Sequence, residues 1–377
     1  MARKIIIQLT STITMGGVEK MVLSLGSKLA LLGRFRTVVC NVTGITSPKL
    51  LAQFSSGDGL LVENLHSGTR NPFTVLPRLL KLCRQYPPAV IHSHQLATFF
   101  WGALLSRLYR APLFCHIHSP DYFIPKMRIL RPLFWRLSPR PTLIATSVAV
   151  QHGLLQVHPF LSRMDIEILP NAIPPPVIMS ASDRAQARQR FAKPDERLLG
   201  FVGRLSPEKN IPLLFRSFHQ VLRQNQGPPA KLLVAGDGPL RSELEALAQT
   251  LRLGQKIIFL GNHPRMEEVY AALDLLILPS QSEGFPLVCL EALAYGVPVL
   301  CSDGMAAKDY LAPYVSLVKA NDEGDLVRAV KDFLAEPAIW RKKAALGREF
   351  VCREHLMPAY AARLEELYLS KLEASKK

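Results

Sequence analysis

Residues 275–299 read LLILPSQSEGFPLVCLEALAYGVPV, and this stretch is the most informative about the fold. An apolar run, a polar loop, a helix-like segment and a second apolar run follow one another, as in the strand, loop, helix, strand order of a parallel α/β sheet. Pro286 suits the first helical turn and Gly296 the C-terminal cap. The free amides near Gly284 to Leu287 are therefore expected to face a cleft and bind a diphosphate or sugar hydroxyls.

The same alternation of apolar runs and amphipathic segments extends through the chain. The predicted strands are 5–9, 37–42, 89–91, 113–117, 143–145, 166–169, 198–202, 231–235, 257–260, 275–278 and 297–300. The proline-rich stretch 170–176, PNAIPPP, interrupts this pattern. We predict an α/β fold with two Rossmann-like domains facing each other across a cleft. The domains are 1–172, onto which a helix at about 357–377 packs back, and 173–356.

Size and composition agree with two domains. The chain has 377 residues, of which 48% are hydrophobic and 20% charged, which is enough to build two cores. Neither a signal peptide nor a run long and apolar enough to span a membrane is expected. The six cysteines are far apart and form no Cys-x-x-Cys pair, which favours free thiols in a reducing cytoplasm.

Positive charge is concentrated in the first half of the chain. Residues 1–172 contain 19 Lys and Arg against 6 Asp and Glu, whereas residues 173–377 contain 27 against 24. Such a field attracts nucleic acid, anionic lipid or phosphorylated substrates, and charge by itself does not distinguish among them.

Four charged residues in the second half are candidates for ligand binding. Arg204 and Lys209 lie in FVGRLSPEKN, between a strand and a helix, where two cations could bind a diphosphate and stabilise the charge of a leaving nucleotide. Glu283 is in the loop before the next helix and Glu291 is inside that helix, so they could contact two parts of one extended ligand. The alternative roles are a capping acid for Glu283 and a solvated helix residue for Glu291.

These motifs resemble the signature of family 4 glycosyltransferases, which are retaining enzymes of the GT-B fold found in bacterial polysaccharide and glycolipid synthesis. The resemblance rests on Glu-Gly-Phe followed by Glu-Ala on a helix, and on Gly-Arg followed by Glu-Lys-Asn. It implies that Glu283 contacts the donor sugar and Glu291 the ribose, and that Arg204 and Lys209 replace a metal ion. Pro286 stands where glycine is commoner in the family, which is expected to stiffen the loop and alter donor choice.

The resemblance extends to further loops at strand ends. The donor-binding residues that it implies are Gly16, Gly17, Gly203, Gly236, Asp237, Gly284, Phe285, Pro286, Leu287 and Glu291. Glycines permit close backbone approach to a ligand, although both Gly16-Gly17 and the loop at Gly236 could equally be plain turns.

Histidines are concentrated after two strands of the first half. His118 is predicted to lie beside the donor sugar, as in many family members, and to share a strand face with His116. His94 could line the same cleft or only satisfy loop hydrogen bonds. A zinc site is not expected, because a third and a fourth ligand are not apparent in the sequence, and no other metal or cofactor is expected.

Residues 122–140, YFIPKMRILRPLFWRLSPR, interleave basic and apolar side chains without an acidic residue. The predicted membrane patch consists of Lys126, Arg128, Arg131, Phe134, Trp135 and Arg136. Such residues can adsorb to an anionic bilayer, and the alternative is a basic helix and loop packed on their own domain.

Together with the resemblance, these observations predict a metal-independent hexosyltransferase, and the resemblance implies that it retains the anomeric configuration. Its expected partners are a nucleotide-sugar donor, a glycan or lipid-linked acceptor and the inner face of the cell membrane, with no nucleic acid. The alternatives are a catalytically silent nucleotide-sugar-binding protein of this fold, a related phosphorylase or epimerase, and a basic nucleic-acid-binding protein. The sugar, the base and the acceptor stay open.

Overall fold

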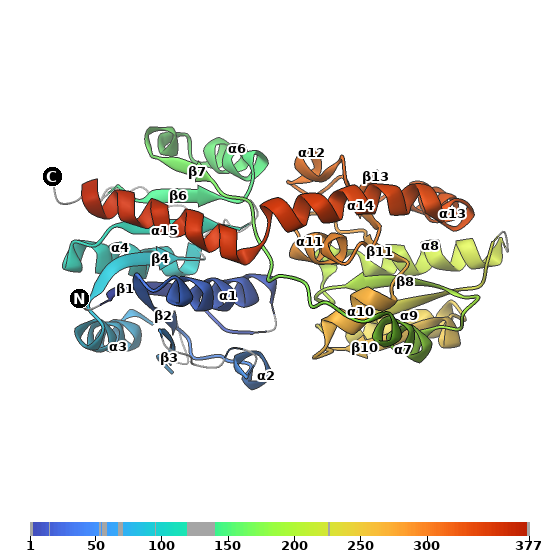
Figure 1. Cartoon of the computed structure of the whole chain (residues 1–377), viewed down its shortest axis with the longest axis horizontal. Coiled ribbons are helices and arrows are strands. Elements are labelled where there is room, and N and C mark those ends of the chain that lie inside the picture. Colours follow the sequence, from blue (N-terminus) through green and yellow to red (C-terminus); the bar gives the residue numbers. More distant parts are fainter. Residues whose placement is uncertain are drawn as a thin grey trace. The chain divides into compact units, whose positions relative to one another are not determined.

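The computed structural model describes residues 3–14, 16–52, 54, 59–66, 71–94, 96–118, 140–224 and 227–374. The chain divides into two compact units (Figure 1). Unit 1 contains residues 1–174 and 356–377, and unit 2 contains residues 175–355. The junction thus falls two residues after the predicted one, within the proline-rich stretch.

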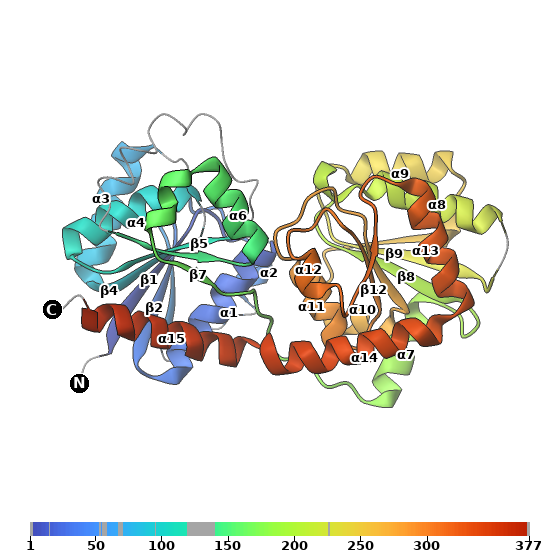
Figure 2. The ribbon, with the colours of Figure 1, turned by 90° about the horizontal axis from the view of Figure 1, so that it is seen from above.

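Unit 1 is a parallel sheet in the order β3-β2-β1-β4-β5-β6-β7, with helices on both faces (Figure 2). Its strands are β1 (Lys4–Thr10), β2 (Phe35–Asn41), β3 (Leu60–Asn64), β4 (Pro88–Ser93), β5 (Leu113–Ile117), β6 (Thr142–Ala145) and β7 (Ile166–Ile168). Its helices are α1 (Gly17–Leu32), α2 (Pro48–Leu51), α3 (Pro72–Gln85), α4 (Leu96–Tyr109), α6 (Val148–Val157) and α15 (Met357–Ala374).

Unit 2 repeats this design with the strand order β10-β9-β8-β11-β12-β13. Its strands are β8 (Arg197–Val202), β9 (Ala230–Ala235), β10 (Ile257–Gly261), β11 (Leu275–Leu278), β12 (Val299–Ser302) and β13 (Ser316–Val318). Its helices are α7 (Ala181–Phe191), α8 (Ile211–Arg223), α9 (Arg241–Thr250), α10 (Met266–Ala272), α11 (Leu287–Ala294), α12 (Lys308–Leu311), α13 (Glu323–Ala335) and α14 (Pro337–Glu354).

Burial of the central strands in the two sheets explains why apolar runs in the sequence predict strands. Helices cover both faces of a parallel sheet, so a central strand is buried on both sides and is apolar throughout. All four residues of β11 are buried, for example. The edge strands β3 and β13 were not predicted, whereas the edge strands β7 and β10, which are also partly buried, were. Strand β3 ends in the polar pair Glu63 and Asn64, and β13 has three residues.

Helix α15 completes unit 1 from a separate part of the chain. It packs against α1 and β4 of unit 1, as predicted for a helix at about 357–377. Tyr368 on this helix is fully buried, and its ring centroid lies 4.8 Å from that of Phe114 and 6.1 Å from that of Phe35. Unit 1 therefore has its core closed by residues that follow all of unit 2 in sequence.

The strand orders determine where a site can form. In unit 2 the order reverses between β8 and β11, and in unit 1 it reverses between β1 and β4. The loops that leave the carboxyl ends of two such strands diverge, which leaves room for a ligand. None of the described helices is both long enough and apolar enough to cross a membrane.

Candidate functional site

The candidate donor site of unit 2 is built from the loops that follow β8 and β11. The first loop holds the exposed Arg204 and the short 3-10 helix Pro207–Lys209, and the second holds Glu283. The backbone N–H of Gln281 donates a hydrogen bond of 2.8 Å to the carbonyl of Glu208, which joins the two loops. Sequence motifs more than 70 residues apart thereby meet at the point where the strand order reverses.

Lys209 and Glu283 form an ion pair across these loops, with side chains that are 19% and 17% exposed. The hydroxyl of Ser280 donates to the same carboxylate over 3.2 Å, and Ser302 donates from its hydroxyl to the Ser280 carbonyl. The backbone N–H of Ala306 donates to the Glu283 carbonyl over 2.7 Å. Glu283 is thus held in place by its side chain and its backbone, and is more than a capping acid.

Glycines allow the neighbouring loops to pack backbone against backbone. Gly203 and Gly236 have φ angles of 151° and 134°, which disfavour any other residue. A Cβ atom on Gly236 would lie 1.9 Å from the Gly203 carbonyl oxygen, and one on Gly238 would lie 2.5 Å from the Leu205 carbonyl oxygen. Asp237 is exposed, and its carboxylate accepts a hydrogen bond of 2.8 Å from the Gly238 N–H. These glycines therefore serve close packing of the loops.

The loop between β11 and α11 is mostly buried. Gly284, Phe285 and Pro286 are buried, and α11 begins at Leu287. Pro286 is the N-cap residue, with ψ at 111°, so the prediction that it occupies the first helical turn is wrong by one position. Gly296 follows the helix with φ at 74°, as expected for a residue that ends a helix in the left-handed conformation.

Glu291 is hydrogen-bonded to a tyrosine that was not among the predicted site residues. The hydroxyl of Tyr270, on α10, donates a hydrogen bond to the Glu291 carboxylate. Burial, together with the charge of Glu291, raises the pKa of Tyr270 well above its usual range, so the phenol stays a donor. Glu291 is therefore an anchored carboxylate, and its alternative role as a solvated helix residue does not hold.

The glycine pair of unit 1 lies where α1 begins. Gly16 is the N-cap residue and Gly17 the first helical residue. The buried carboxylate of Glu19 accepts hydrogen bonds from the hydroxyls of Thr12, over 3.2 Å, and Thr14, over 3.4 Å. A Cβ atom on Gly16 would lie 2.1 Å from a Glu19 oxygen, so a glycine there makes room for this carboxylate. Glu19 was not among the predicted site residues, although its position three residues after Gly16 was visible.

Four histidines stack on the face of the unit 1 sheet formed by β4 and β5. The ring centroids of His92 and His94 are 4.1 Å apart, as are those of His116 and His118. One ring nitrogen each from His92, His94 and His116 lie within 4.8 Å of one another, a spacing that could hold a metal ion. The sequence argument against zinc was that a third and a fourth ligand are absent, and in the structure His116 lies close enough to His92 and His94 to be the third.

All four imidazoles are buried and therefore neutral near neutral pH. Burial lowers the pKa of His118 to about 4, against an opposing effect of the Asn171 side chain. His94 lies with its Nε2 3.0 Å from the Gln8 side-chain oxygen. The two histidines predicted as site residues, His94 and His118, are thus buried at the carboxyl ends of β4 and β5.

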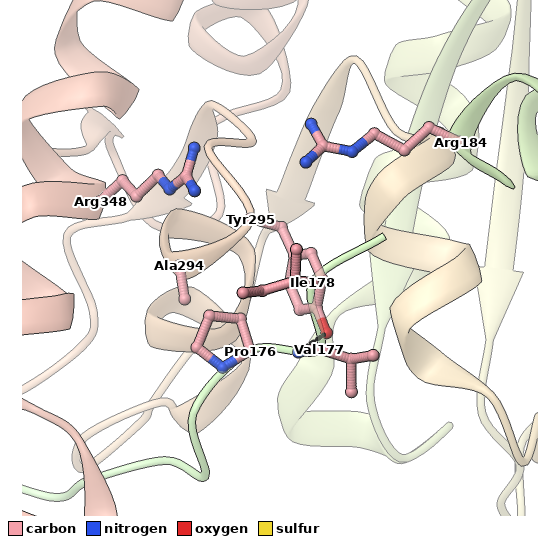
Figure 3. A pocket seen from close by; sticks show the side chains of 7 residues that line it. All are labelled: Pro176, Val177, Ile178, Arg184, Ala294, Tyr295 and Arg348. Atoms are coloured by element: carbon pink, nitrogen blue, oxygen red, sulfur yellow. Dashed lines mark hydrogen bonds between the residues drawn. The ribbon is translucent and has the colours of Figure 1, made fainter. Parts of the chain in front are cut away.

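A separate pocket in unit 2 lies at the other end of α11 (Figure 3). It is lined by Pro176, Val177, Ile178, Arg184, Ala294, Tyr295 and Arg348. The Tyr295 hydroxyl accepts a hydrogen bond of 3.0 Å from the Val177 N–H. The pocket contains none of the predicted site residues.

The predicted membrane patch, Lys126, Arg128, Arg131, Phe134, Trp135 and Arg136, lies outside the described residues. The six cysteines lie within them, and each has a free thiol, with five buried and Cys352 partly exposed.

Two family models match the chain, one on each unit. The model described as "Glycosyltransferase Family 4" matches residues 15–175, and the model described as "Glycosyl transferases group 1" matches residues 183–349. The candidate donor site lies within the second match, and the glycine pair and the four histidines lie within the first.

Similar proteins agree with these matches. An uncharacterized glycosyltransferase of Methanocaldococcus jannaschii, MJ1607, is 30% identical over 56% of this chain and 57% of its own length. A D-inositol 3-phosphate glycosyltransferase of Nocardia farcinica is 37% identical over 49% of this chain and 45% of its own. The chain therefore matches only about half the length of these relatives. A crystal structure of Anabaena HepE with UDP and glucose has a TM-score of 0.81 at 19% identity, covering 98% of this chain and 100% of HepE.

Proposed function

Because this chain belongs to the family 4 type of glycosyltransferases and has the two α/β domains of the GT-B fold, we propose that it transfers a sugar from a nucleotide-sugar donor. The proposed sugar is a hexose, and the proposed reaction retains the anomeric configuration. The acceptor that we propose is a glycan or a lipid-linked glycan of the cell surface.

The observation that carries this proposal is the pairing of Lys209 with Glu283 at the reversal of strand order in unit 2. The pair combines a cation suited to phosphate with a carboxylate suited to sugar hydroxyls. Glu291, held by Tyr270, is the second carboxylate along the same segment and is assigned to the ribose. Arg204 is exposed on the loop of Lys209 and is assigned to the diphosphate.

The proposed chemistry follows from where charge develops. As the bond between the sugar and the phosphate breaks, negative charge grows on the leaving diphosphate, and fixed cations stabilise it more than they stabilise the ground state. Lys209 and Arg204 would fulfil this role without a metal ion. The leaving phosphate accepts the proton of the acceptor hydroxyl, and Glu283 stabilises the positive charge that develops on the sugar ring.

The charge of the first half of the chain supports an anionic acceptor. Residues 1–172 carry a net charge of +13, which favours a phosphate-linked or membrane-bound acceptor over a neutral one. Basic residues near an anionic bilayer contribute about 1 kcal/mol each to adsorption. We therefore place the working enzyme at the cytoplasmic surface of the membrane. Co-sedimentation with anionic liposomes at low salt tests this placement, and a protein that stays in the supernatant contradicts it.

The donor assay uses UDP-, GDP- and ADP-hexoses in the presence of EDTA, with nucleotide release as the signal. We expect release from one donor, and a large fall in its rate in both Glu283→Gln and Arg204→Ala. The anomeric proton of the product, observed by NMR, tests retention. A folded protein that binds none of the donors contradicts the proposed function, and activity that needs added Mg²⁺ contradicts the metal-independent mechanism.

A further inference from the structure

Four buried imidazoles form one continuous cluster in unit 1. His92 and His94 are two residues apart, as are His116 and His118, so each pair shares one face of the sheet. Strands β4 and β5 are neighbours, with Ser93 paired to Cys115, which sets the two pairs side by side. The His116 ring centroid lies 5.6 Å from that of His92 and 5.7 Å from that of His94.

Several nitrogens of this cluster lack partners among the residues that the structure describes. A neutral imidazole has one N–H donor and one nitrogen lone pair. The Nε2 of His94 faces the Gln8 side-chain oxygen, so it carries the proton and leaves a lone pair on Nδ1. That Nδ1, the Nε2 of His92 and both nitrogens of His116 have no hydrogen-bond partner in the described part of the chain. Buried polar atoms are nearly always paired, so these atoms point to a ligand.

We propose that His92, His94 and His116 bind a divalent transition-metal ion, with Zn²⁺ as the best-suited candidate. Neutral imidazole nitrogen is a preferred ligand of Zn²⁺, Cu²⁺ and Ni²⁺. One nitrogen from each ring already lies within 4.8 Å of the others. In a tetrahedral zinc site such nitrogens are about 3.3 Å apart, so side-chain rotations must bring them about 1.5 Å closer.

The surroundings of the cluster support a metal site. Metal-binding histidines usually have their second ring nitrogen hydrogen-bonded, which fixes the ring orientation. His94 has Gln8 in this role, and the Nδ1 of His92 is hydrogen-bonded to the hydroxyl of Tyr368. The fourth ligand is water or His118, whose ring stacks on that of His116.

The residues proposed to bind the metal are not those assigned to the donor diphosphate. The residues assigned to the donor diphosphate, Arg204 and Lys209, belong to unit 2, whereas the three histidines belong to unit 1. Tyr368 belongs to α15, the helix that closes the core of unit 1. An ion that binds only the folded protein stabilises the fold by mass action, so we infer that the metal stabilises this closure.

The test uses the full chain without a histidine tag, stripped of metal with a chelator and dialysed. Zinc bound per chain is measured by elemental analysis, and Co²⁺ is added as a spectroscopic probe of coordination. We expect one Zn²⁺ per chain, visible ligand-field bands of four-coordinate Co²⁺, and a higher unfolding temperature of unit 1 with metal. Gln8→Met should weaken Zn²⁺ binding by about 10- to 100-fold, because it removes the hydrogen-bond partner that orients the His94 ring.

The informative variant is His116→Phe, which removes a ligand but keeps a flat ring in a buried position. It should abolish binding of both metals. The matched control is His152→Phe, on an exposed position of α6, which should bind as the wild type does. If His116→Phe fails to fold, His92→Phe replaces it, with circular dichroism as the check of folding.

Two results would overturn the proposal. One is a wild-type protein that binds Zn²⁺ well below one equivalent and gives only the spectrum of hydrated Co²⁺. The other is Zn²⁺ binding that persists unchanged in folded His116→Phe, or in folded His92→Phe where that variant replaces it. Neither result bears on the assignment of Arg204 and Lys209 in unit 2 to the donor diphosphate, which nucleotide release tests.

Discussion

Replacing Lys209 by methionine separates its proposed action on the donor phosphate from its pairing with Glu283. The substitution keeps most of the apolar stem of the side chain and removes the ammonium group, with its charge and its hydrogen-bond donors. Removing one fixed group that stabilises transition-state charge lowers kcat by about 10²- to 10³-fold. We expect a loss of this size for Lys209→Met, measured as donor-dependent nucleotide release.

The same substitution lowers stability, because it leaves Glu283 without its cation. Breaking a fully buried pair costs about 3–5 kcal/mol, and a pair with 19% and 17% exposed side chains should cost less, about 1–2 kcal/mol. The matched control is Lys231→Met, which breaks the 3.0 Å pair of Lys231 with Glu196 in the same unit. Urea unfolding should give similar losses for both variants, while kcat falls only for Lys209→Met.

A double-mutant cycle with Glu283→Gln gives the decisive comparison. If Lys209 contacts the diphosphate, Lys209→Met should still lower the remaining activity of Glu283→Gln by about 10²-fold or more. If Lys209 only neutralises Glu283, the second substitution should have no further effect. Two results would refute the assignment of Lys209 to the diphosphate. One is that Lys209→Met has no further effect in Glu283→Gln, and the other is that Lys209→Met is as active as the Lys231→Met control.

Three further substitutions have defined outcomes. Gly236→Ala should lower the free energy of unfolding by about 2 kcal/mol or more, because the new methyl group meets a backbone carbonyl and φ is 134°, whereas Gly254→Ala, which has open space, should be tolerated. Equal urea midpoints for the two variants would contradict this. Tyr270→Phe removes the hydrogen bond to Glu291 and should raise the donor Kd about tenfold by calorimetry, a loss of about 1.4 kcal/mol; an unchanged Kd would argue against the ribose assignment. Burial raises the pKa of Glu365. The free energy of unfolding is therefore not reduced by this residue below its ordinary pKa of 4.5, and it falls as the pH rises through the raised pKa. Glu365→Gln should therefore stabilise the protein by about 1 kcal/mol at neutral pH and match the wild type below pH 4.5, as checked by urea unfolding at both values. A difference that does not depend on pH would contradict this cause.

The central strands, and the place of Glu283 in the loop after one of them, could be predicted from the sequence because their signals are local. A strand buried on both faces must be apolar throughout, and the loop around Glu283 directly follows such a strand. The edge strand β3 lacks that signal, because its sequence LLVEN ends in two polar residues, whereas the edge strand β10, IIFLG, is apolar and was predicted.

The partners of the site residues could not be predicted, because they come from other elements. Tyr270 is 21 positions before Glu291, and nothing in α10 distinguishes its tyrosine from one that only packs in a core. His116 was recognised as sharing a face with His118, but its approach to His92 depends on β5 lying beside β4. Such contacts follow from strand order, which local periodicity does not encode.

The return of the chain into unit 1 has a consequence for synthesis on the ribosome. Residues 175–355 emerge before 356–377, so unit 2 can complete its fold while unit 1 still lacks the helix carrying Tyr368. During that interval the apolar surface around Phe35 and Phe114 stays uncovered, and nascent chains with such surfaces are targets for chaperones and aggregation. Unit 1, whose residues 1–174 are synthesised first, is therefore the last to complete its fold.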